Sequence, residues 1–165
     1  MLLLCALGFL LPACGGNSPG REPPATPSPL LSVDPALLAP LEGLGPCGSP
    51  PAAAEAPTVE GLRLPDGAVI TEVTDSGPLT TVQGWVPLTP IQLRVHYQRL
   101  DGIEVLNAED EVWESETLFT DGRRRLFVKA QAMCESASLL VAVVAPESQG
   151  EAVPVPAGAS PSPTG

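Results

Sequence analysis

Side chains that commonly perform catalysis are sparse in this sequence. His96 is the only histidine, and it falls beside Tyr97 in a segment that we expect to be helical. A histidine general base needs a serine or cysteine nucleophile within hydrogen-bond reach. We assign no such partner to His96. We therefore expect position 96 to be a solvated helix residue, and we predict that the protein is not an enzyme.

The densest charge is an acidic segment. It contains Glu104, Glu109, Asp110, Glu111, Glu114 and Glu116. Calcium needs several oxygens that converge from one tight loop, and the EF-hand spacing is absent. Adjacent acids in a strand point to opposite faces. A weak divalent site is the alternative to the interpretation that we favour, namely solvated acids that discourage sheet-to-sheet aggregation. We predict no metal and no cofactor.

One basic cluster follows the acidic segment, made of Arg123, Arg124, Arg125 and Lys129. Across a hairpin, Arg124 or Arg125 would face Glu114 or Glu116 as an exposed ion pair, which is worth about 0–1 kcal/mol. The functional alternative is a patch that binds an anion or at which a partner docks.

Two tryptophans, Trp85 and Trp113, are the largest aromatic side chains. We expect them in the core or at its rim rather than on a ligand platform. The sequence contains no phosphate-cradling loop, no dinucleotide fingerprint and no Cys/His metal spacing.

The start of the chain resembles the signal peptide of a bacterial lipoprotein. Residues 2–12 are apolar or small, too few to span a bilayer but enough for the hydrophobic region of a secretory signal. Leu11-Pro12-Ala13-Cys14 resembles the lipobox that ends such signals. This resemblance implies cleavage before Cys14, a diacylglycerol on its thiol and acylation of the new amino terminus. Two or more acyl chains would hold the protein stably on a membrane. An ordinary cleaved signal is the alternative.

The four cysteines are consistent with that location. Cys5 would leave with the signal and Cys14 would carry the lipid. Cys47 and Cys134 then remain as a pair in an oxidising compartment, and we predict a disulfide between them. A redox-active pair is disfavoured because there is no Cys-x-x-Cys motif.

Composition narrows the range of partners. The 165 residues carry a net charge of −11. Binding to nucleic acid requires clustered Lys and Arg, so we expect no nucleic-acid partner and no electrostatic adhesion to anionic lipids. Aromatic residues make up only 4%, which indicates one small core of Val, Leu, Ile and Ala.

Turn and capping signals divide the central region into elements. Thr89-Pro90 is typical of an N-cap and first helical position, and we expect this helix to end at Asp101-Gly102. Strands are expected at 68–73, 79–86, 103–106, 112–120, 123–134 and 138–145. Asp121-Gly122 is a strong hairpin signal. The economical fold is α+β, a small two-layer sandwich with one helix on an antiparallel sheet of about five or six strands.

The alternation within 123–134 predicts which side chains face the core. Leu126, Val128, Ala130 and Ala132 share one face. The other face carries Phe127, Lys129, Gln131 and Met133 and should be mostly solvated.

Five regions follow along the chain. Residues 1–13 are the signal, 14–29 a lipidated Pro-rich tether and 30–58 an arm that carries Cys47. The globular domain is 59–146, and 147–165 is expected to be a disordered tail. Pro35 and Pro40 should limit any helix in the arm to about one turn.

These observations predict a lipid-anchored cell-envelope protein that faces the periplasm or exterior. We expect a non-catalytic structural or interaction module that binds an envelope protein or a cell-wall partner. The alternatives are a small-ligand carrier, with its ligand between helix and sheet, and a small envelope hydrolase.

Overall fold

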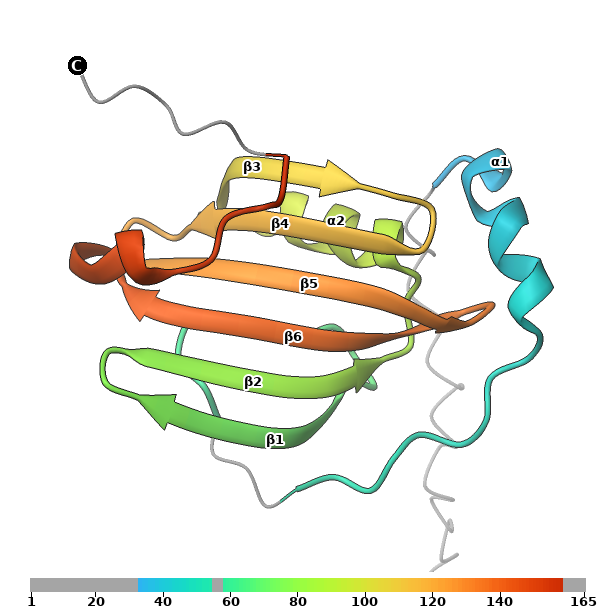
Figure 1. The fold of residues 1–165 in the computed structure, drawn as a ribbon, viewed down its shortest axis with the longest axis horizontal. Helices are drawn as coiled ribbons and strands as arrows, with labels where there is room; N and C mark the ends of the chain where they lie inside the picture. The colour runs from blue at the N-terminus through green and yellow to red at the C-terminus, as the bar shows by residue number, and fades with distance from the viewer. Residues whose placement is uncertain (1–32, 55–57, 159–165) are drawn as a thin grey trace, which may run out of the picture. The chain divides into compact units, whose positions relative to one another are not determined.

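A computed structural model describes residues 33–54 and 58–158. Six antiparallel strands form one sheet in the order β1-β2-β6-β5-β4-β3, and the helix α2 packs on β3, β4 and β5 (Figure 1). The strands are β1 (Val69–Ser76), β2 (Leu79–Val86), β3 (Glu104–Asp110), β4 (Glu114–Thr120), β5 (Arg124–Cys134) and β6 (Ala137–Pro146), and α2 is Pro90–Gln98. The predicted α+β class, with one helix on an antiparallel sheet, is confirmed. The lipobox, Cys14 and the tether lie outside the described residues.

The main core lies between the sheet and α2, on what we call the inner face. Leu93 and Tyr97 of α2 meet Val82, Phe119 and Leu126 of the sheet, and all five are at most 1% exposed. The segment 58–64 packs against the same core through partly buried apolar side chains, Val59, Leu62 and Leu64. Burial of these residues is the main free-energy source for the fold.

The helix α2 begins where the sequence predicts and ends earlier. Thr89 caps it, and the Thr89 and Gln92 side chains and backbones form a reciprocal capping box. The last helical residue is Gln98, because the amide of Arg99 donates to the carbonyl of His96 (3.2 Å) and tightens the chain into a turn. Gly102 closes this turn with φ of +75°, so it acts after the helix rather than at its end.

The β3–β4 hairpin is longer than expected on one strand and shorter on the other. Its strands run to Asp110 and from Glu114, whereas we predicted 103–106 and 112–120. Backbone hydrogen bonds join Glu111 and Glu114 in both directions (2.8 and 3.3 Å). This tight closure leaves Val112 and Trp113 in the turn, where both are exposed.

The opposite, outer face of the sheet is only partly solvated, which corrects the prediction for Phe127. Phe127 is 6% exposed and packs with Leu118, Val143 and Val153. The cover is the C-terminal strap, residues 147–158, which begins with the short helix η2 (Glu147–Ala152) and crosses β5, β4 and β3 (Figure 1).

The expected disordered tail therefore does not begin at residue 147. Val153 and Pro156 are buried, and the amide of Ala157 donates to Glu116 Oε2 (3.0 Å). The apolar contacts and the hydrogen bond to the Glu116 carboxylate hold residues 147–158 in place, although their composition alone suggested a coil. Residues 159–165 lie outside the described residues.

The arm, residues 33–54, carries two short helical segments and is fastened to the sheet. The α-helix α1 (Pro35–Leu38) is one turn, as Pro35 and Pro40 predicted, but the chain continues as a 3-10 helix, η1 (Ala39–Leu44). A Cys47–Cys134 disulfide with a Cα–Cα distance of 5.1 Å confirms the predicted pairing. Backbone hydrogen bonds from Glu135 to Gly45 and from Ala54 to Ile70 add two further attachments.

Candidate functional site

His96 contacts the backbone of the segment that precedes β1. Its Nε2 lies 3.2 Å from the carbonyl oxygen of Arg63. A carbonyl oxygen only accepts, so Nε2–H is the donor. The ring is half-buried instead of fully solvated, and it helps to hold the 58–64 segment against α2.

The acidic residues are distributed over β3, the following turn and β4. Lys129 Nζ lies 2.6 Å from Glu114 Oε1 and 2.9 Å from Glu116 Oε1. These hydrogen bonds from the two carboxylates raise the pKa of Lys129. Within residues 33–54 and 58–158, no group of three or more His, Cys, Asp or Glu side chains is arranged to hold a metal ion. Asp110 instead pairs with Arg94 of α2, Glu114 and Glu116 bind Lys129, and Glu109 and Glu116 accept hydrogen bonds from backbone amides near residue 158.

The residues of the basic cluster lie on both faces of the sheet. Arg124 lies on the inner face and pairs with Glu60 and Asp121, whereas Arg125 lies on the outer face and pairs with Glu147. Lys129 takes the cross-strand partners that we had expected for Arg124 or Arg125. Arg123 is exposed and has no ion pair among the described residues. The four residues therefore do not form one basic docking patch.

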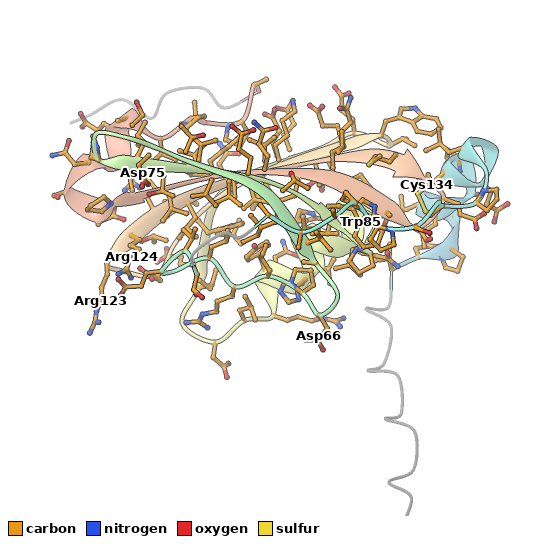
Figure 2. The ribbon with its side chains drawn as sticks, turned by 90° about the horizontal axis from the view of Figure 1, so that it is seen from below. Asp66, Asp75, Trp85, Arg123, Arg124 and Cys134 are labelled. Carbon is orange, nitrogen blue, oxygen red and sulfur yellow. A yellow bond between two sulfur atoms is a disulfide. The ribbon has the colours of Figure 1, made fainter. Side chains whose placement is uncertain are left out.

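A different surface gathers exposed apolar side chains. A hollow of about 420 Å³ lies between the arm and the outer face, and its lining includes Leu44, Trp85, Met133, Cys134 and Leu139. Figure 2 shows Trp85 and Cys134 at the same end of the sheet. We call this site the disulfide-end hollow.

Apolar side chains in the lining of this hollow are open to solvent. Leu44 is 40% exposed, Met133 50% and Leu139 46%, and Trp85 is half-buried at the rim. Its walls are pre-formed, because the disulfide and the Glu135–Gly45 hydrogen bond fix the arm. Clustered exposed apolar groups on a rigid frame are typical of an interaction site.

No protein-family model matches this chain, and neither the curated proteins nor the solved structures contain a significant match. None of the helices in the described ranges is long and apolar enough to cross a membrane. The functional argument therefore rests on the geometry of the chain itself.

Sequence reasoning missed the disulfide-end hollow because its residues come from the arm, β1, β2, β5 and β6, far apart in the chain. The signal that could have found it is the Cys47–Cys134 pairing, which brings the arm beside Met133. Sequence reasoning also passed over Gly16-Asn17-Ser18-Pro19-Gly20, which has Gly-x-Ser-x-Gly spacing. That motif acts only on a strand-turn-helix, and its residues lie outside the described ranges.

Proposed function

We propose that this protein is an envelope lipoprotein, anchored through acylated Cys14, that binds a partner polypeptide through the disulfide-end hollow. The observation that carries the binding role is the rigid, exposed apolar lining of Leu44, Met133 and Leu139. A hollow of about 420 Å³ accommodates one large apolar anchor, the kind of residue that dominates many interfaces.

Charge selects the kind of partner. No Lys or Arg lines the hollow, and the exposed Glu72 and Glu135 directly follow the lining residues Thr71 and Cys134. The net charge of −11 opposes association of two copies of this chain. The partner should therefore present a large apolar side chain flanked by Lys or Arg.

The packing does not favour the ligand-carrier alternative. Leu93, Tyr97 and Phe119 fill the space between α2 and the sheet and are almost fully buried. The lipid anchor is supported by the lipobox resemblance, and the disulfide is compatible with an oxidising compartment.

Site-specific crosslinking in intact cells tests the binding role. A photoreactive residue at position 133 should give a defined adduct, and one at position 106 should not. Leu106 lies on the edge strand β3 and is 41% exposed, so it controls for accidental contacts. Leu139→Ser should weaken the adduct at least about tenfold, whereas the matched Leu106→Ser should leave it unchanged.

The chemistry of the adduct decides the partner class. A crosslinked peptide with an apolar residue beside Lys or Arg, and a yield that falls as salt rises, supports the proposal. Equal yields at positions 133 and 106, or an acidic partner segment, would overturn it. Separately, Cys14→Ser should move the protein from the membrane fraction to the soluble fraction, and unchanged membrane retention would refute the anchor.

A further inference from the structure

A second recess lies at the opposite end of the sheet from the disulfide. It has a volume of about 440 Å³, within the size range of small-ligand pockets. Its lining carries four charged residues, Glu60, Asp75, Arg123 and Arg124, beside Val73, Thr80 and Val144. Figure 2 shows Asp75, Arg123 and Arg124 at the same end of the sheet, away from Trp85 and Cys134. We call it the turn-end groove.

The guanidinium groups of Arg123 and Arg124 differ in whether carboxylates of this chain bind them. Arg124 is 22% exposed and already pairs with Glu60 and Asp121, so it forms part of the wall. Arg123 has a fixed backbone, because its amide donates to Asp121 Oδ1 (2.8 Å) and its carbonyl accepts from the amide of Glu147 (2.8 Å). Its side chain has no carboxylate partner within the described residues. Arg123 therefore has a fixed backbone and an exposed guanidinium that a ligand can reach.

Asp75 supplies the opposite charge. Its Oδ1 accepts a hydrogen bond from the Thr80 hydroxyl (2.7 Å), which orients the carboxylate. No Lys, Arg or His in the described ranges forms an ion pair with it. Arg123 and Asp75 line the same groove but do not pair with each other. Each leaves bonding capacity that a ligand can satisfy.

The geometry points to a zwitterionic ligand, an amino acid or a short peptide, with its carboxylate on Arg123 and its ammonium on Asp75; we propose the turn-end groove as that site. Val73, Val144 and Pro146 provide an apolar floor for a small aliphatic side chain. Both charged side chains are exposed, so a simple ion would use only one of them, whereas a zwitterion uses both. This inference does not depend on the proposed docking at the disulfide-end hollow.

Three related probes separate the two charges. Glycyl-valine carries both, its N-acetyl derivative lacks the ammonium, and its C-terminal amide lacks the carboxylate. Titration into the full chain is followed by NMR, using the Arg123 side-chain Nε–H and the Thr80 amide. Glycyl-valine should give saturable shifts at millimolar concentrations, and each capped form should bind about tenfold more weakly.

Two variants assign each charge to its residue. Arg123→Gln should lower the affinity for glycyl-valine to that of the C-terminal amide probe. It should leave the affinity for that probe unchanged. Asp75→Asn should lower the affinity for glycyl-valine to that of the N-acetyl probe. It should leave the affinity for the N-acetyl probe unchanged. Arg99→Gln and Asp66→Asn remove the same charges at exposed positions outside the lining. Figure 2 shows Asp66 far from Asp75. Both control variants should bind like the wild type.

Several results would overturn the assignment. These are the absence of saturable shifts with glycyl-valine up to about 10 mM, equal affinity for all three probes, or equal losses in the test and control variants. Matching thermal unfolding midpoints for the four variants would show that any loss of binding is local.

Discussion

The ring of Tyr97 on α2 stacks on the ring of Phe119 on β4, with centroids 4.7 Å apart and an interplanar angle of 26°. This contact joins the helix to the sheet at the centre of the inner-face core. The Tyr97 hydroxyl is buried and has no hydrogen-bond partner among the described residues. Burial raises the pKa of Tyr97, so the phenol stays protonated across the ordinary pH range.

The unpaired hydroxyl makes Tyr97→Phe an informative substitution. The variant keeps the ring stack and removes a buried polar atom that costs about 1–3 kcal/mol when it is unsatisfied. We expect the free energy of unfolding to stay level or to rise by about 1 kcal/mol, as measured by urea unfolding. Tyr97→Leu, which removes the stack, should lower it by about 2 kcal/mol. A loss above about 1 kcal/mol in Tyr97→Phe would mean that the hydroxyl has a partner.

Asp121 should make the fold sensitive to acid. Desolvation is the largest single influence and acts to raise the pKa of Asp121. The amides of Arg123 and Arg124 and the Arg124 guanidinium together outweigh it, so the pKa is lowered. A lowered folded-state pKa gives stability that is present above the unfolded value of about 3.9 and is lost as the pH falls through the folded value.

Asp121→Asn tests this linkage, because asparagine keeps an acceptor and suits the same turn. The variant should be less stable than wild type by on the order of 1 kcal/mol at pH 7, and the gap should narrow below about pH 4. Denaturant unfolding at a series of pH values measures the gap. Asp66→Asn, at an exposed turn, provides the baseline; a gap for Asp121→Asn that stays constant with pH would contradict the argument.

The Cys47–Cys134 disulfide joins residues 87 positions apart. On the chain-entropy model such a loop contributes on the order of 4 kcal/mol. Replacing both cysteines by serine should lower the free energy of unfolding by about that amount in a denaturant titration. Reductant should destabilise the wild type similarly and leave the double variant unaffected. Equal stability of the two proteins without reductant would show that the arm is held by its other contacts.

The elements that the sequence predicts well are defined by neighbouring residues. Thr89, Pro90 and Gln92 lie within four positions and contain the whole capping box of α2. Asp121-Gly122 likewise marks its hairpin, because the acceptor and the amides that it binds are two and three residues apart. Such local chemistry needs no knowledge of the rest of the fold.

The misassigned ion pair shows where local reasoning fails. Arg124 and Arg125 are closer in sequence to Glu116 than Lys129 is. In an antiparallel hairpin, however, a residue of β4 pairs with the residue of β5 that lies equally far from the turn. Thr120 pairs with Arg125, and so Glu116 pairs with Lys129. The pairing register, rather than sequence distance, selects the partner. The disulfide-end hollow was missed for a related reason, because residues from five separate segments build it.

The strap is the clearest case of order imposed by distant residues, and one pair of valines tests it. Val153 is 4% exposed against Phe127 and Leu118, whereas Val155, two residues on, is 59% exposed. Val153→Ser should lower the free energy of unfolding by about 2 kcal/mol and increase binding of a hydrophobic dye, because the outer-face cluster loses its cover. Val155→Ser should change stability by less than about 0.5 kcal/mol. Urea unfolding of both variants measures the difference, and equal effects would mean that residues 153–158 do not cover the sheet in solution.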